Sequence, residues 1–152
     1  DAMKVAGSSR LFLNLLALNA GNYQSPLGWF GRLKTEGGRV DLKRCGVMPI
    51  LSAARVGALR HGIEARSTVD RLEALAHRDA VSAHVVADLM ESHRVCMSAI
   101  LRQQLQDLER GVRLSNLVDP SMLSRPERRH LVWALERVEA IADVLGTPAQ
   151  PD

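Results

Sequence analysis

The stretch from Ser82 to Gly111, SAHVVADLMESHRVCMSAILRQQLQDLERG, decides the fold class. Ser82 is a residue type that caps the first turn of a helix, and Gly111 is the type at which helices end. Between them apolar residues recur at helical spacing, and charged residues occupy the other side. We therefore predict one long amphipathic helix that packs one face against other helices. Its predicted apolar arc comprises Val85, Val86, Leu89, Met90, Cys96, Met97, Ile100, Leu101 and Leu108.

Two polar residues lie on or beside this arc. His93 falls near its middle, and Gln104 lies one face over. Buried polar groups usually find local partners, so we favour a hydrogen-bonded core pair. The alternative is that the two side chains line a groove.

Shorter helices are predicted on both sides of the long one. Ser8-Ser9 can cap the first, and Pro49 suits the first turn of the second. Ser67 is a cap for the third, and Ser124-Arg-Pro-Glu127 is a capping box for the last. The predicted ranges, with approximate ends, are 9–20, 49–60, 67–76 and 124–145.

The segment between the first two helices is broken by glycine and proline. Within it, Trp29–Leu33 and Arg39–Leu42 are predicted as two short strands joined by a turn at Gly37-Gly38. The chain is therefore predicted to be a mainly all-α, antiparallel bundle of about five helices, with one short β-hairpin near its N-terminal end. We assign residues 1–152 to a single helical domain with its core at about 8–146.

The composition agrees with a small helical domain. Aromatic residues make up only 3%, which disfavours sheets, and a net charge of +3 permits a phosphate ligand without indicating nucleic acid. Cys45 and Cys96 lack any Cys-x-x-Cys spacing and are expected to be free thiols. The apolar run Leu11–Leu18 is too short to cross a bilayer. We expect a cytoplasmic location without a membrane partner.

No catalytic motif is found in the sequence. Two carboxylates one residue apart on a strand can share a metal ion, but the acid-x-acid pair here, Asp107 and Glu109, falls in the long helix, where the two side chains diverge. The five histidines never stand three or four residues apart, which disfavours zinc. We expect no catalytic residue and no metal site in this chain alone.

The predicted hairpin is strongly basic. Arg32, Lys34, Arg39, Lys43 and Arg44 fall within thirteen residues, with Asp41 among them. Arginine and lysine are the natural partners of phosphate, and a Gly-Gly turn lets backbone approach a ligand closely. The alternative is a solvated hairpin whose charges protect an exposed edge from aggregation, and the charge pattern alone favours it.

Several separate motifs resemble, in the same order, the family of nucleotidyltransferase substrate-binding domains. They are PLGWFGRL (26–33), GRVDLKR (38–44), PI (49–50), AARVGALRHG (53–62), LRQQL (101–105), NLVDP (116–120), LS (123–124) and ERR (127–129). Members of this bacterial family typically follow a catalytic domain related to the PII-protein uridylyltransferases, often behind cyclic-nucleotide-binding and CBS domains. The resemblance implies the C-terminal half of a two-domain transferase, whose upstream domain would hold magnesium and the nucleoside triphosphate.

The resemblance also implies a set of site residues. In the related uridylyl- and adenylyltransferases a lysine-containing hairpin closes the nucleotide cleft, so Asp41, Lys43 and Arg44 would face the catalytic domain, with Arg32 and Arg39 nearby. Cys45-Gly46-Val47-Met48 departs from the double glycine and acid of those enzymes. Arg60-His61 would either line the same cleft or brace the hairpin, and both alternatives stay open.

A second function class is a non-catalytic interaction module. In that interpretation the bundle transmits signals from upstream sensor domains, or forms a homodimer through Trp133 and the last helix. The transferase interpretation has the upstream domain as partner in cis, and a nucleotide or protein as acceptor. Nucleic acid is not expected as a partner, because aromatic stacking residues are too few.

Overall fold

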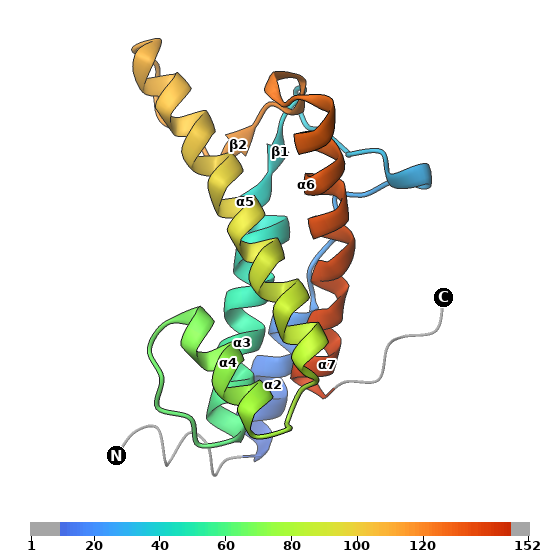
Figure 1. The fold of residues 1–152 in the computed structure, drawn as a ribbon, viewed down its shortest axis with the longest axis vertical. Coiled ribbons are helices and arrows are strands. Elements are labelled where there is room, and N and C mark those ends of the chain that lie inside the picture. The colour runs from blue at the N-terminus through green and yellow to red at the C-terminus, as the bar shows by residue number, and fades with distance from the viewer. Residues whose placement is uncertain (1–9, 147–152) are drawn as a thin grey trace.

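The computed structural model describes residues 10–146, and its helices form an elongated bundle (Figure 1). Five helices have ten residues or more, which confirms the predicted fold class. They are α2 (Arg10–Gly21), α3 (Met48–Arg60), α4 (Thr68–His77), α5 (Ala83–Glu109) and α6 (Arg125–Arg137). A sixth, α7 (Ile141–Leu145), is only a little longer than one turn. None of these helices is both long enough and apolar enough to span a membrane.

Local capping signals set the helix starts, as predicted. The Oγ atoms of Ser67, Ser82 and Ser124 accept hydrogen bonds from backbone N–H groups three residues later. Ser124 and Glu127 form the reciprocal capping box. The predicted cap at Ser8-Ser9 lies outside the described residues.

The last predicted helix is interrupted. A 3-10 turn at Val138–Ala140 separates α6 from α7, and Gly146 ends α7 in the left-handed region at φ 61°. The predicted apolar face is otherwise correct, because Leu131, Leu135 and Leu145 are buried.

The long helix α5 has the predicted ends but only part of the predicted arc. Val86, Leu89, Cys96 and Ile100 are buried, whereas Leu101 is 53% exposed and Leu108 67% exposed. In the same turns the chain buries Gln103 and Asp107 instead.

Residues 115–119, which we call the crossing segment, explain why polar side chains are buried here and leucines are exposed. The Asp107 carboxylate accepts from the Gln103 amide at 2.9 Å and from the Ser115 backbone N–H at 3.0 Å. The Gln103 oxygen accepts from the Asp119 N–H at 3.0 Å. The segment after α5 thus satisfies its backbone N–H groups with these two side chains, since buried polar groups require partners.

The predicted core pair of His93 and Gln104 is wrong. Gln104 donates to the Asn116 side chain at 3.2 Å, and His93 is half-buried. The two residues stand eleven positions apart on one helix, about 16 Å along its axis. Burial lowers the pKa of His93 from its ordinary value.

The antiparallel strand pair exists, but its second strand differs from the prediction. β1 (Val40–Asp41) pairs with β2 (Leu117–Val118), in the register Val40 with Val118 and Asp41 with Leu117. Trp29–Leu33 is not a strand, because Trp29–Gly31 forms a 3-10 turn and Gly31 has φ 68°. Alternating apolar residues near a Gly-Gly turn could not reveal a partner so far along the chain.

The turn itself is correctly predicted. Gly37 and Gly38 have φ values of 58° and 79°, and Glu36 and Arg39 exchange backbone hydrogen bonds of 2.9 and 3.1 Å across them. Glycine adopts positive φ angles at little cost because it has no Cβ, so two successive glycines suit this turn.

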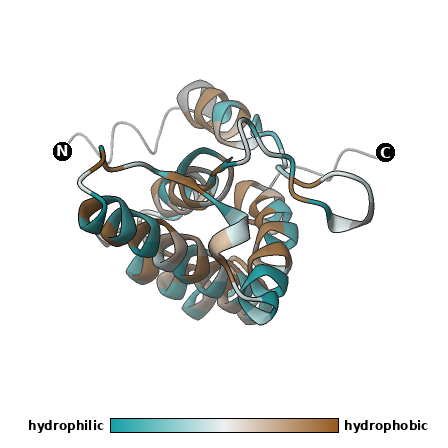
Figure 2. Ribbon diagram, turned by 90° about the horizontal axis from the view of Figure 1, so that it is seen from above, coloured by the Kyte–Doolittle hydropathy of each residue, from teal (hydrophilic) through white to brown (hydrophobic). Residues whose placement is uncertain are grey.

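Two clusters form the core. One joins α2, α3, α4 and α7 to the first half of α5. The other joins β1, β2 and the turn at residues 42–47, just before α3, to the middle of α5 and to α6. Seen from above, each helix carries both hydrophobic and hydrophilic turns (Figure 2).

Two glycines allow the closest approaches within the core. A Cβ at Gly46 would lie 2.6 Å from the Cys96 sulfur, and one at Gly57 would lie 2.8 Å from a Leu75 methyl carbon. Cys45 and Cys96 are free, as predicted, and the structure buries both. Burial raises the pKa of each thiol to about 12.

Candidate functional site

The site begins where β1 enters α3 through a wide helical turn. Lys43–Val47 is π-helical, and its last hydrogen bond runs from the Met48 N–H to the Lys43 carbonyl. Pro49 has no N–H and would clash with the carbonyl four residues earlier in a regular helix, so a wider turn accommodates it. Asp41 caps this turn by accepting the Arg44 N–H at 3.0 Å. Single π turns are frequent at functional sites.

A groove of about 410 Å³ lies beside this turn. Its walls come from residues 22–26 after α2, residues 34–36, β1, the start of the π-helical turn, and Leu117 of β2. Three cationic side chains line it: Lys34, Arg39 and Arg44. We call it the cationic groove.

The cations of this groove form no close ion pair within the described part of the chain. Hydrogen bonds from Ser121, and to a smaller extent the charges of Arg39 and Arg110, lower the pKa of Asp119. None of the ion pairs found between residues 10 and 146 involves Lys34, Arg39 or Arg44. The Arg39 Nη1 donates to the Leu117 carbonyl at 3.2 Å, which fixes the guanidinium against β2. Of the two acidic residues in the lining, Asp41 is engaged by the Arg44 backbone, and Glu36 lies in the exposed turn. The local field therefore favours an anion.

Two neutral polar groups lie in the same lining. The Tyr23 hydroxyl is buried and has no hydrogen-bond partner among the described residues, and burial, with a smaller effect of Glu139, raises its pKa. Burial likewise keeps the Cys45 thiol protonated, with its pKa at about 12. A protonated thiol is a poor nucleophile and a poor metal ligand. The Tyr23 hydroxyl is buried behind the lining and is not exposed in the groove.

The structure brings together only some of the residues predicted for the site. Arg39, Asp41 and Arg44 line the cationic groove, whereas Lys43 is exposed beside it and is not part of the lining. Arg32 lines a second hollow of about 410 Å³, together with Arg128 and Ser121.

The pair Arg60-His61 lies at the other end of α3. The thirteen residues of that helix span about 20 Å, which separates the pair from the groove. Arg60 donates to the Leu145 carbonyl, and Arg78 donates to the His61 carbonyl. The pair thus ties α3 to α7 and α4, and the structure does not place it on the hairpin.

Tyr23 and Lys34 were not among the predicted site residues. Lys34 was visible in the basic cluster, but its place in the groove depends on how the loop folds. Tyr23 is the single tyrosine of the chain and follows a Gly-Asn helix stop, which gives no signal of a binding role.

Possible metal ligands are dispersed. Among residues 10–146, no group of three or more His, Cys, Asp or Glu side chains is arranged to hold a metal ion.

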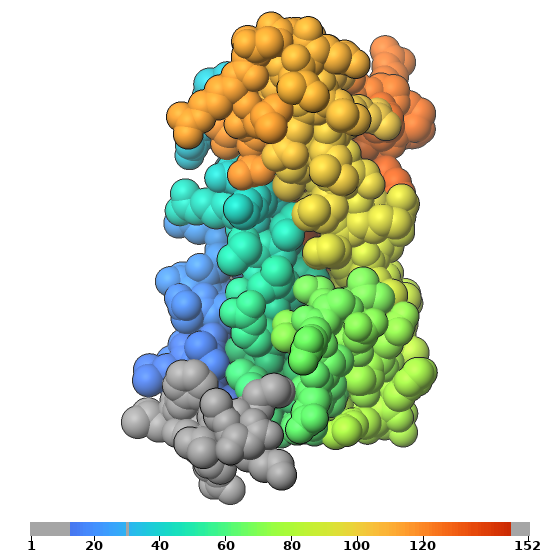
Figure 3. All heavy atoms as spheres, turned by 90° about the vertical axis from the view of Figure 1, so that its left-hand side faces the viewer, coloured from blue at the N-terminus to red at the C-terminus, as the bar shows by residue number. Residues whose placement is uncertain are grey.

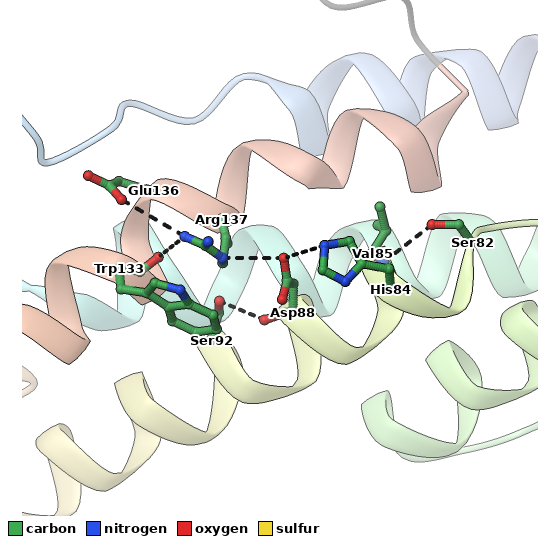
Figure 4. Close-up of polar contacts among 8 residues, drawn as sticks. All are labelled: Ser82, His84, Val85, Asp88, Ser92, Trp133, Glu136 and Arg137. Carbon is green, nitrogen blue, oxygen red and sulfur yellow. Dashed lines mark hydrogen bonds and ion pairs between the residues drawn. The ribbon is translucent and has the colours of Figure 1, made fainter.

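Trp133 takes part in contacts within the chain. The Arg137 guanidinium stacks over its ring at 4.2 Å, and the Arg137 Nε lies 3.3 Å from the Asp88 carboxylate of α5 (Figure 4). The His130 ring centroid is 5.5 Å from that of Trp133. The indole is half-buried, so these contacts help to join α6 to α5.

Comparison with known proteins identifies the family. Residues 10–147 match the family model described as "Putative nucleotidyltransferase substrate binding domain". No curated protein and no solved structure matches the chain. The match spans nearly the whole sequence and includes every motif quoted above. The chain belongs to the putative nucleotidyltransferase substrate binding domain family.

Proposed function

We propose that the cationic groove binds the phosphate groups of a nucleotide, and that the chain supplies this wall to the cleft of a nucleotidyltransferase. One observation carries the proposal: Lys34, Arg39 and Arg44 converge on one groove, and none of them takes part in an ion pair among the described residues. The family to which the chain belongs supports the same substrate class.

The three cations have different parts in this proposal. Arg39 is held by the Leu117 carbonyl, which orients its remaining N–H donors toward a phosphate before binding. Arg44 is positioned through its backbone by Asp41, so Asp41 acts as a positioning residue. Lys34 adds a mobile point charge.

The catalytic carboxylates, magnesium and the nucleoside triphosphate belong to an upstream domain in this proposal. Transfer of a nucleotidyl group proceeds mainly through positioning and stabilisation of charge on the reacting phosphate. The groove would supply cations to that charge when it closes over the upstream site. Lys43 is exposed beside the groove and would face the catalytic domain rather than the ligand. The acceptor would be a second substrate or a protein. The reducing cytoplasm, where nucleotides are plentiful, suits the two free thiols.

The test is calorimetric titration with ATP and with UTP, with magnesium, at low salt. Arg44→Ala should weaken binding about 10- to 100-fold, because a hydrogen bond to a charged group contributes about 1.5–3 kcal/mol. Arg66→Ala is the matched control, since Arg66 is exposed in the loop before α4.

Two results would count against the proposal. A chain that binds neither nucleotide has no independent phosphate site in this groove. An equal loss with Arg66→Ala would show that only net charge matters, not the groove.

The second candidate function, an interaction module, is supported by large apolar side chains that remain exposed on α5. A module that dimerises through Trp133 is less well supported, since Arg137 covers part of that ring. Trp133→Ala tests that version by sedimentation, and an unchanged molecular mass would exclude it.

A further inference from the structure

The second half of α5 carries an apolar face that no described element covers. Leu101, Leu105 and Leu108 are 53%, 61% and 67% exposed, and Val112 and Leu114 continue the face beyond the helix with 53% and 55%. This end of α5 extends past the neighbouring helices (Figure 1), and Figure 3 shows its gold and orange atoms uncovered at the top of the molecule. We call these five residues the leucine face. A contiguous exposed apolar patch of this kind marks an interaction site more often than chance.

The leucines have the spacing of a helix–helix contact. Leu101, Leu105 and Leu108 are separated by four and then three residues, which is the repeat that aligns side chains along a packed helix. Val112 lies just beyond the end of the helix, where its N–H donates to the Asp107 carbonyl at 3.0 Å.

The helix cannot turn these leucines inward. Gln103 and Asp107 are on its opposite side, are 3% and 2% exposed, and bind the N–H groups of Asp119 and Ser115. Rotation of α5 would leave those backbone groups without partners. Gln103 and Asp107, which we call the polar anchor, therefore hold the leucine face toward solvent.

The charges that flank the face are self-complementary. Arg102 and Glu109 stand on one edge, seven residues apart and of opposite sign, and the other edge carries the neutral Gln104. In an antiparallel pair with Leu105 near the two-fold axis, Leu101 would meet the partner subunit's Leu108. Arg102 would meet the partner subunit's Glu109 across the same axis.

From this pattern we infer that a second copy of the chain binds the leucine face, through antiparallel packing of α5 against α5. Arg102 already binds Glu127 in its own chain. The guanidinium has five N–H donors, so it can hold a second carboxylate. Glu109 takes part in no ion pair among residues 10–146, so it is available to the partner. This surface is separate from Trp133 and from the cationic groove.

Site-directed disulfide cross-linking tests the geometry. Leu105→Cys should oxidise to a covalent dimer by itself, because the axis brings two copies of this position together. Leu101→Cys should not cross-link with itself but should do so when mixed with Leu108→Cys. The native Cys45 and Cys96 are buried, so they should not form disulfides between two copies of the chain. Cross-linking of Leu101→Cys alone would overturn the antiparallel arrangement.

Sedimentation equilibrium tests the energetics with matched charge swaps. Arg102→Glu and Glu109→Arg should each weaken the dimer several-fold, and the double variant should restore it. Leu105→Glu should be monomeric and still folded, since this side chain is 61% exposed. A wild-type chain that stays monomeric at ~1 mM, the weak end of specific affinity, would overturn the inference and leave the face to an unlike partner. Failure to rescue by the double variant would equally overturn it.

Discussion

Replacement of Asp107 tests whether the buried polar anchor holds the end of α5 in place. The carboxylate accepts two hydrogen bonds, from the Gln103 amide at 2.9 Å and from the Ser115 N–H at 3.0 Å, and Asp107 is only 2% exposed. Asp107→Ala removes both acceptors and leaves two donors without partners. A buried donor without a partner costs about 1–3 kcal/mol, so the free energy of unfolding should fall by about 2–5 kcal/mol.

The isosteric variant separates the polar effect from packing. Asp107→Asn keeps the volume and one acceptor but presents an amide N–H to one donor, so it should lose about 1–3 kcal/mol. Glu73→Ala, at an exposed position of α4, is the control for loss of an acid.

The assay is urea denaturation followed by circular dichroism. A low protein concentration keeps self-association from contributing to the measured stability. If Asp107→Ala unfolds within about 1 kcal/mol of the Glu73→Ala control, the anchor is not a buried partner of the crossing segment. The claim that it holds the leucine face outward would then be refuted as well.

Two further predictions concern packing and pH. Gly46→Ala should lower the free energy of unfolding by about 1–3 kcal/mol, because its Cβ would meet the Cys96 sulfur at 2.6 Å. Cys96→Ala in the same chain should recover part of that loss in a denaturation series, and additive losses would contradict the contact. Hydrogen bonds from Arg102 and Ser124 lower the pKa of Glu127 from 4.5 to about 2. The stability that ionised Glu127 contributes is therefore complete above the unfolded pKa of 4.5 and is lost as pH falls toward 2. The free energy of unfolding of Glu127→Gln, measured as a function of pH, should therefore fall less steeply between these values than that of the wild type.

Local signals predicted most of the helices. Ser67, Ser82 and Ser124 each bind an N–H group three residues away, so a short sequence window contains both partners. The same reason explains why the turn at Gly37-Gly38 was predicted correctly. Element starts therefore follow from the sequence wherever a side chain caps its own helix.

Long-range pairings could not be predicted in this way. Val40 pairs with Val118, and no pattern near either residue names the other. Leu101 and Leu108 were assigned to the core because hydrophobicity alone cannot reveal that a loop with unsatisfied N–H groups takes the opposite side of α5. Gln103 and Asp107 are buried on that side because they accept hydrogen bonds from the N–H groups of the loop.

The lining of the cationic groove divides in the same way between local and long-range signals. The cluster of cations around the Gly-Gly turn is a feature of adjacent residues, so the sequence could name Arg39 and Arg44, which the structure places in one groove. Tyr23 enters the groove from another segment and could not be found. Arg60 was placed near the groove by resemblance, but the length of α3 carries it to the other end of the bundle.

The pairing of β1 with β2 also sets the order in which the site can be assembled. Arg39 binds the carbonyl of a residue that lies 78 positions further along the chain. During synthesis the ribosome releases the arginine long before Leu117, so the wall of the groove cannot close until most of the chain has emerged. Closure of so long a loop is slow compared with helix formation, and the helices should fold first. The wall of the groove would then form after the helices that precede Leu117 along the chain.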